Sequence, residues 1–212
     1  TPTKTEIEAA MFYELLALAR QVPVVVVSGA MRAQIEKQMP HIAVLPRALL
    51  LAQNGNDASE AAGRALWRFA LGEPEKVEIM AHVRAAAERM GTPISPATLE
   101  DRGCQLSLSF VGHNAPRAEK IQFDPDRSRR RALLAALPFE SQVCTVTIGG
   151  TTCLDYTRKD ATKGANVARL MANTGLTRAL YVGDAIVPGG NDETVIGVCD
   201  TRLASGPRET LA

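Results

Sequence analysis

An unbroken apolar run near the start of the chain constrains the fold more than any other feature. Residues 22–27 are apolar and rich in β-branched valine, and they end in Ser28-Gly29. A strand without alternating polar positions is buried on both faces, which is typical of a parallel sheet covered by helices on both sides. The run therefore predicts an α/β fold, with Ser28 directly after a strand that is buried on both faces.

Further strands and helices of the same kind surround this run. Helical spacing of apolar residues predicts helices over 6–21, 30–38 and 163–173, the last closed by Gly175. Strands are expected within 45–57, at 179–182 and at 194–198. Alternating helices and strands indicate a Rossmann-like α/β unit with a parallel sheet.

The middle of the chain has a different pattern. Residues 104–112 alternate polar and apolar, and residues 142–150 and 151–157 are typical of a hairpin around Gly149-Gly150. Helices are predicted at 74–90 and at 124–137, where the Asp-rich segment DPD starts the second helix. An antiparallel α+β domain at 72–156 is therefore expected to interrupt an α/β core made of 1–71 and 157–212.

Composition excludes several classes of function. The 212 residues carry a formal net charge of +1 and only 4% aromatic residues, which argues against a nucleic-acid partner. The four cysteines form no CxxC pair, and no apolar run approaches the ~18 residues of a membrane span. We expect a cytoplasmic protein that binds a small molecule and neither nucleic acid nor membrane, and the sequence leaves a homodimer open.

One loop carries an unusual density of oxygen ligands. The predicted strand at 179–182 leads into GDAIVPGGND, which presents Asp184, Asn191 and Asp192. Such a loop is often only a turn, but a strand end in an open α/β sheet is also where ligands bind. Carboxylates there are suited to a hard cation such as Mg²⁺.

Other polar groups lie at the ends of predicted elements. Ser28 follows the first strand, Lys163 opens a helix, and Asp184 and Asp192 surround the loop. A hydroxyl group, an ammonium group and a metal-binding carboxylate pair are what a phosphoryl group needs, because they bind its oxygens and neutralise its charge. Taken together, these positions predict a site for phosphoryl transfer.

The chain resembles a known superfamily at these positions. VVVVSGA, ATKGANVARL and GDAIVPGGND are similar to motifs II, III and IV of the haloacid dehalogenase (HAD) phosphotransferases. The middle domain resembles a type IIB cap, and DRGCQLSLSFVG, FDPDRSRRRALL and GGTTCLDYT are similar to the phosphomannomutase-like branch. This resemblance implies a Mg²⁺-dependent phosphatase or phosphomutase that acts on a sugar phosphate.

The resemblance also implies roles for particular residues. Ser28 and Lys163 would be catalytic, and Asp184, Asn191 and Asp192 would hold Mg²⁺. In the cap, the residues implied to bind substrate are Arg102, His113, Lys120, Cys153 and Asp155. His113 and Lys120 replace arginines of the family, and neither can form the bidentate fork of Arg on a phosphate. If Arg102 and Lys120 bind the distal phosphate of a substrate together, both should face the Asp184 loop.

The nucleophile of the resembled family lies in a DxDGT-type motif. We expect that motif directly upstream of Thr1, in a longer form of the protein. The alternative is a sugar-phosphate-binding relative that is not catalytic. A dinucleotide-binding domain is a weaker third option, because no GxGxxG follows an early strand.

Some conspicuous residues have ordinary interpretations. His41 and His82 are expected to be structural or surface residues, and Asn54-Gly55 is expected to form a tight turn. The basic run RSRRR at 127–131 is interpreted as a solvated helix face.

Overall fold

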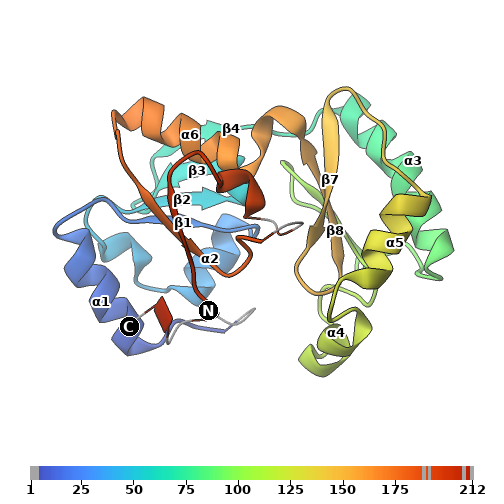
Figure 1. Cartoon of the computed structure of the whole chain (residues 1–212), viewed down its shortest axis with the longest axis horizontal. Helices are drawn as coiled ribbons and strands as arrows, with labels where there is room; N and C mark the ends of the chain where they lie inside the picture. Colours follow the sequence, from blue (N-terminus) through green and yellow to red (C-terminus); the bar gives the residue numbers. More distant parts are fainter. Residues whose placement is uncertain (1–4, 188–189, 191, 207–208, 211–212) are drawn as a thin grey trace. The chain divides into compact units, whose positions relative to one another are not determined.

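The computed structural model describes residues 5–187, 190, 192–206 and 209–210 (Figure 1). The chain divides into two compact units: unit 1 comprises Thr1–Phe69 and Ala161–Ala212, and unit 2 comprises Ala70–Asp160. Unit 2 therefore separates the two parts of unit 1 along the sequence. Both units contain β-sheet and apolar core clusters.

A four-stranded sheet with the order β1-β2-β3-β4 forms the first part of unit 1. Its strands are Val25–Val27 (β1), Leu49–Ala52 (β2), Asp57–Glu60 (β3) and Ala65–Arg68 (β4). β1 is parallel to β2, whereas β3 and β4 are antiparallel to their neighbours in the sheet. The apolar run at 22–27 therefore supplies a strand to a parallel pair, as predicted. The predicted burial on both faces is wrong, because β1 stands at the end of the strand order among the described residues and Val25–Val27 are only half-buried.

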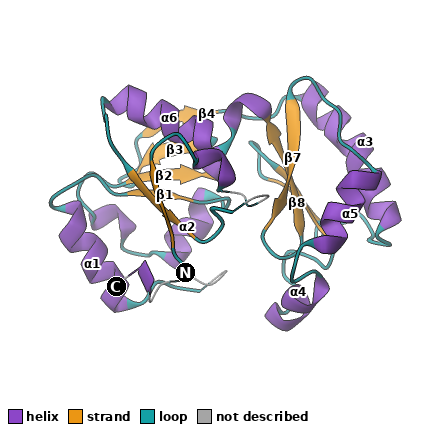
Figure 2. Cartoon of the chain, viewed as in Figure 1, coloured by secondary structure: helices purple, strands orange, loops and turns teal. Residues whose placement is uncertain are grey.

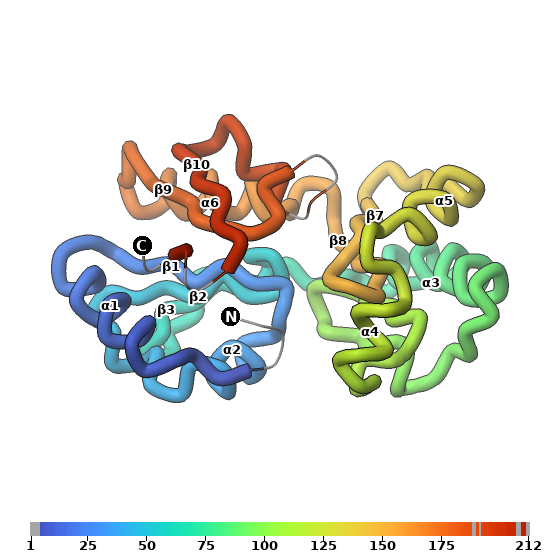
Figure 3. Tube along the Cα trace, turned by 60° about the horizontal axis from the view of Figure 1, so that its bottom comes forward, coloured from blue at the N-terminus to red at the C-terminus, as the bar shows by residue number. Residues whose placement is uncertain are grey.

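A second, two-stranded sheet forms the later part of unit 1. It pairs β9 (Leu180–Gly183) with β10 (Asp200–Leu203) in parallel. Helix α6 (Lys163–Thr174) lies beside these strands in Figure 3, and Val167 and Leu170 of α6 share a core cluster with Tyr181 of β9. Gly175, at a φ of 68°, ends α6 in the left-handed conformation, as predicted.

Helices cover both faces of the sheet in unit 1. Leu50 is fully buried in a cluster with residues of α1 (Ala9–Ala19) and α2 (Arg32–Gln38), whereas Leu51 is fully buried in the cluster with α6. Successive strand residues point to opposite faces, so the two leucines pack against helices on opposite sides of the sheet. Burial of each leucine side chain stabilises the fold by roughly 1.5–3 kcal/mol. The predicted α/β class is confirmed.

Unit 2 contains a four-stranded antiparallel sheet with the order β5-β6-β8-β7. Its strands are Leu99–Asp101 (β5), Leu106–Ser109 (β6), Cys144–Gly149 (β7) and Cys153–Arg158 (β8), and its helices are Glu73–Arg89 (α3), Arg117–Phe123 (α4) and Ser128–Ala136 (α5). Within this unit, α3 and α5 lie on one side of the sheet (Figure 2). The predicted hairpin is present as β7 and β8.

The two faces of this sheet differ in polarity. Leu106, Leu108 and Leu154 are buried in one cluster with residues of α3 and α5. Ser107 and Asp155 alternate with these leucines along β6 and β8, so their side chains belong to the opposite face. Unit 2 therefore combines an apolar face under helices with a polar face.

The basic run at 127–131 corrects one prediction. Asp124 and Asp126 accept hydrogen bonds from backbone N–H groups at the start of α5, as expected of the DPD segment. Arg130, however, is fully buried: its guanidinium donates to Asp124 at 2.7 Å and to the carbonyl oxygens of Gly149 and Cys153. The interpretation as a wholly solvated face is wrong at Arg130, because partners distant in sequence satisfy its charge.

The strand predicted at 194–198 is also wrong. A 3-10 turn, Glu193–Val195, occupies its start, and Gly197 at a φ of 83° turns the chain before β10 begins at Asp200. Val195 is buried in that turn, whereas Ile196 is 54% exposed. In the part of the chain that the structure describes, no helix is long and apolar enough to cross a membrane.

Candidate active site

Two loops meet at the carboxyl ends of β1 and β2. The backbone N–H of Ser28 donates to the carbonyl oxygen of Leu51 at 3.0 Å, and the N–H of Asn54 donates to the carbonyl oxygen of Ser28 at 2.8 Å. The Ser28 hydroxyl accepts from the N–H of Ala30 at 3.1 Å. Asn54 has a φ of 61°, in agreement with the predicted tight turn. Ser28 is therefore held in a defined loop next to a second loop.

Asn166 connects the second of these loops, the one after β2, to α6. Its side-chain amide donates to the carbonyl oxygen of Asn54 at 3.0 Å and to Asn56 Oδ1 at 3.2 Å, and the residue is fully buried. A buried amide stabilises a structure only when it is hydrogen-bonded, so these contacts fix the start of α6 against the β2 loop. The sequence analysis missed Asn166; the available signal was an Asn on the buried face of an amphipathic helix, one turn after Lys163.

Lys163 and Asp192 form a buried ion pair. The Lys163 ammonium donates to Asp192 Oδ1, and the two side chains are each only 5% exposed. Tyr181 of β9 donates its hydroxyl to the same oxygen at 2.8 Å. One carboxylate oxygen therefore receives two donors from two different elements.

Electrostatics keep Tyr181 a donor. Burial raises the pKa of the Tyr181 hydroxyl, and the negative charges of Asp192 and Asp184 raise it further. The phenol is therefore protonated at neutral pH. Asp184, the residue after β9, is exposed and close enough to act on Tyr181 through its charge.

Two threonine hydroxyls accept hydrogen bonds from backbone N–H groups at the start of α6. Thr162 caps α6 by accepting from the N–H of Ala165 at 3.2 Å, and Thr194 Oγ1 accepts from the N–H of Gly164 at 3.0 Å. A helix N-terminus with satisfied amides is rigid, so Lys163 projects from a fixed position.

In unit 2, the predicted substrate residues Arg102, His113 and Lys120 lie near one another. Arg102 donates from Nε and Nη2 to Glu100 Oε2, at 2.9 and 2.7 Å. His113 is buried, with Nε2 3.0 Å from the carbonyl oxygen of Ser107 and Nδ1 3.6 Å from Glu100 Oε2. Lys120 of α4 donates to the carbonyl oxygen of His113 at 2.6 Å.

Asp155 and Cys153, the other two predicted residues of unit 2, lie on β8. Asp155 Oδ1 accepts from the Ser107 hydroxyl at 2.6 Å, while burial raises the pKa of its carboxyl. Burial likewise raises the pKa of the half-buried Cys153 thiol, so it is not a thiolate at neutral pH. Glu100 and Ser107 were not among the predicted residues; Ser107 lies within the segment DRGCQLSLSFVG, and Glu100 directly precedes it.

Comparisons with known proteins identify the fold. No protein-family profile matches the chain, and neither does any curated protein. Among solved structures, the N-terminally truncated, IMP-bound IMP-nucleotidase of Plasmodium falciparum superposes with a TM-score of 0.66 at 12% identity, covering 100% of this chain and 63% of that one. A Streptococcus mutans UA159 protein gives 0.64 at 16% identity, over 99% of this chain and 86% of that one. A haloacid dehalogenase-like hydrolase of Bacteroides thetaiotaomicron gives 0.56 at 14% identity, over 94% and 81%.

The chain has the haloacid dehalogenase-like fold. The chain covers 62–63% of the length of three similar IMP-nucleotidase structures. At sequence identities of 12–16%, the similarity to these structures is a similarity of fold.

Within this haloacid dehalogenase-like fold, the predicted core residues gather at the ends of their elements. The structure brings Lys163 and Asp192 into contact, ties the loop after β2 to α6 through Asn166, and leaves Asp184 exposed. Asn191 lies outside the described residues. Among the residues that the structure does describe, no three His, Cys, Asp or Glu side chains are grouped to hold a metal ion.

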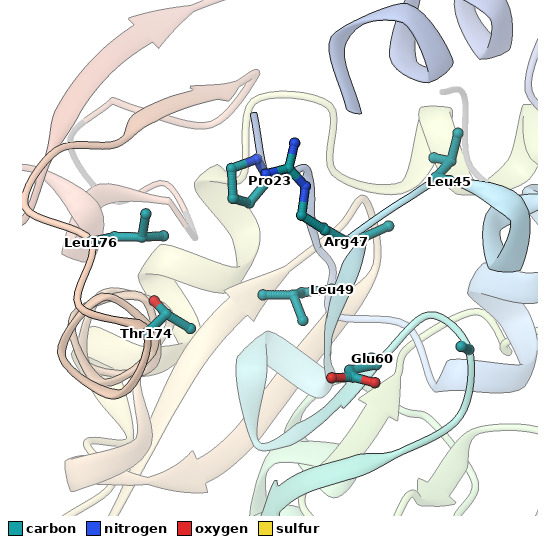
Figure 4. A pocket seen from close by; sticks show the side chains of 9 residues that line it. Pro23, Leu45, Arg47, Leu49, Glu60, Thr174 and Leu176 are labelled. Atoms are coloured by element: carbon teal, nitrogen blue, oxygen red, sulfur yellow. The ribbon is translucent and has the colours of Figure 1, made fainter. Parts of the chain in front are cut away.

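A pocket of ≈ 450 Å³ in unit 1 is separate from these residues (Figure 4). Its lining includes Pro23, which precedes β1, and Leu49, which begins β2. The pocket is therefore at the amino ends of the strands, whereas Ser28 and Asn54 follow the carboxyl ends. It takes no part in the candidate site.

Proposed function

We propose that the protein is a Mg²⁺-dependent phosphatase or phosphotransferase that acts on a sugar phosphate and is related to the phosphomannomutase-like branch of the HAD superfamily. The observation that carries the proposal is the buried Lys163–Asp192 pair at the start of α6, close in sequence to the exposed Asp184. A buried charge pair costs desolvation energy, and such pairs are often found where chemistry needs fixed charges.

Each core residue has a chemical role in this proposal. Ser28 and the amides of its loop bind oxygens of the phosphoryl group, and Lys163 neutralises its negative charge. Asp184, Asn191 and Asp192 supply oxygen ligands, which are the kind that Mg²⁺ prefers. When bound, Mg²⁺ would polarise the phosphoryl oxygens. Asp192, already fixed by Lys163 and Tyr181, would keep its ligand oxygen in place.

Unit 2 carries its own proposed substrate contacts. Arg102, His113, Lys120, Cys153 and Asp155 are the proposed contacts, with Ser107 and Asp155 suited to sugar hydroxyls because they can accept hydrogen bonds. Which of these five residues touch a substrate is open to mutational tests.

One observation favours a second candidate function, a sugar-phosphate-binding protein without catalysis. The one Asp-x-Asp segment of the 212 residues, Asp124–Asp126, starts α5 in unit 2, and its first carboxylate is paired with Arg130. Residues 1–212 therefore present no assigned nucleophile.

A hydrolysis screen separates the two candidates. Hexose 1- and 6-phosphates are assayed with Mg²⁺ or with EDTA, with and without a hexose bisphosphate, for the wild type, Lys163→Ala and the exposed control Lys37→Ala. Turnover that needs Mg²⁺ and is lost only in Lys163→Ala supports the enzyme. Binding without turnover supports the second candidate. The absence of both binding and turnover would contradict the proposal. Activity in Lys163→Ala equal to that of the wild type would also contradict it.

A further inference from the structure

A ring of contacts within unit 1 holds the loop after β2, residues 53–56, from two sides. On one side, the N–H of Phe69, the residue after β4, donates to the carbonyl oxygen of Asn56 at 2.8 Å. On the other side, the Asn166 amide of α6 donates to Asn56 Oδ1 at 3.2 Å. Arg169, one turn further along α6, joins the two sides: its guanidinium lies 4.3 Å from the centroid of the Phe69 ring and donates to Asn166 Oδ1 at 2.7 Å.

The Asn166 amide has one favourable orientation in this ring. Its Nδ2 faces three acceptors at 3.0–3.2 Å, which are the carbonyl oxygens of Asn54 and Ala161 and Asn56 Oδ1. Asn56 is itself oriented, because its Nδ2 donates to the carbonyl oxygen of Gln53 at 2.8 Å. A reversed Asn166 amide would place its oxygen against these acceptors and its NH₂ group against the guanidinium.

The hydrogen bond from Arg169 favours that orientation most strongly. It is charge-assisted, and such bonds are shorter and stronger than those between neutral groups. At 2.7 Å it is shorter than the three bonds that Asn166 Nδ2 donates. Asn166 is fully buried, and the half-buried Arg169 is further held by the face of the Phe69 ring, a contact that desolvation strengthens.

The loop after β2 is hydrogen-bonded to the Ser28 loop. The N–H groups of Gln53 and Asn54 donate to the carbonyl oxygens of Ala30 and Ser28, at 2.9 and 2.8 Å. A continuous path of hydrogen bonds therefore leads from Arg169 through the loop after β2 to Ser28.

We infer that Arg169 is a positioning residue of the proposed phosphoryl site: it fixes the Asn166 amide and, through the loop after β2, holds the Ser28 loop in the conformation that binds a phosphoryl group. The inference rests on the proposed function. Arg169 needs no contact with the ligand, because the coupling passes through packed and hydrogen-bonded groups of unit 1. Lys163, Asn166 and Arg169 follow one another at intervals of three residues on α6, so successive turns carry the ion pair, the loop contact and the residue that orients it.

Amide hydrogen exchange without added ligand tests the positioning. The N–H of Asn54 is followed by NMR in the wild type, in Arg169→Met, which keeps the length of the side chain but cannot donate, and in the control Arg178→Met, whose arginine is 89% exposed. Asn54 should exchange about tenfold faster in Arg169→Met only, because a charge-assisted hydrogen bond is lost. The N–H of Leu49, which donates to Val24 at the other end of β2, should keep its rate. Equal acceleration at Asn54 and Leu49, or an unchanged rate at Asn54, overturns the inference.

A double-mutant cycle tests whether Arg169 acts through Asn166. Inorganic phosphate with Mg²⁺ is titrated by calorimetry into the wild type, Arg169→Met, Asn166→Ala and the double variant, and the exchange rate of Leu49 shows that each is folded. Each single variant should bind phosphate about tenfold more weakly, and the double variant should bind it no more weakly than Asn166→Ala. Additive losses, or the wild-type affinity in Arg169→Met, overturn the inference. Failure of the proposed function has a different signature, because the wild type would then bind no phosphate while the exchange of Asn54 would still respond to Arg169→Met.

Discussion

Asp192 is the residue on which the candidate site depends most. Lys163 and Tyr181 both donate to its Oδ1, and Asp192 and Lys163 are almost wholly buried. Lys163 and Asp192 could be picked from the sequence because polar residues at element ends are conspicuous. Tyr181 could not, because it lies in an apolar strand and only the fold directs its hydroxyl to a carboxylate.

Tyr181→Phe should destabilise the protein. The substitution keeps the ring and removes one hydrogen bond to a charged acceptor, so the free energy of unfolding should fall by about 1.5–3 kcal/mol. Chemical denaturation measures the change. Tyr13→Phe is the matched control, since Tyr13 is 67% exposed and its loss should change little. A loss in Tyr181→Phe no greater than in the control would mean that the phenol does not hold Asp192.

At the scale of elements, the sequence predicts strongly patterned segments and misses those formed by long-range pairing. The segments that form β1, β2 and α6 are apolar or amphipathic, and their secondary structure was predicted from that pattern. β3 and β4 were missed because they are rich in Ala and charged residues, and their strand conformation comes from pairing with β2. Arg130 was misread for a similar reason: its partners are a carboxylate six residues away and the β7–β8 turn.

The packing of α6 gives a prediction about Gly164. A Cβ atom there would lie 1.8 Å from the backbone oxygen of Thr194, which cannot move away as a side chain could. Although Ala favours a helix by about 1 kcal/mol over Gly, Gly164→Ala should lower the free energy of unfolding by ~1–3 kcal/mol. Gly206→Ala, which meets open space, should change stability by less than about 0.5 kcal/mol. If the two variants behave alike in thermal denaturation, α6 does not pack closely on this turn.

The start of α5 gives a prediction about pH. Burial tends to raise the pKa of Asp124, but hydrogen bonds from Arg130 and from the amides of Arg129 and Arg130 lower it overall. The unfolded chain therefore binds this proton more readily, so the stability that Asp124 contributes is present above its ordinary pKa of 3.8 and is lost as the pH falls below that value.

Asp124→Asn tests that linkage. At pH 7 the variant leaves Arg130 buried without its counter-charge and should be less stable by about 3–5 kcal/mol. The difference from the wild type should shrink as the pH falls below 3.8. Urea denaturation followed by circular dichroism at a series of pH values measures it, with the exposed Glu88→Gln as control. A difference that is independent of pH would show that the carboxylate charge is not what stabilises α5.

At the scale of the whole molecule, the change between buried and alternating strand patterns predicts two units with different sheets. The haloacid dehalogenase-like fold agrees with the solved structures. The pairing of Arg102 with Glu100 was not foreseen, because it depends on their contacts in the folded unit and not on a motif.

The binding of inorganic phosphate in the presence of Mg²⁺ tests the central claim most directly. Calorimetry should show saturable, Mg²⁺-dependent binding to the wild type and to Lys37→Ala. Binding to Lys163→Ala and to Asp184→Asn should be at least about tenfold weaker, because the first loses the charge that neutralises the phosphoryl group and the second loses a charged oxygen ligand of Mg²⁺. The same affinity in all four proteins, or no phosphate binding to the wild type, would contradict the assignment of this edge of unit 1 as a phosphoryl site.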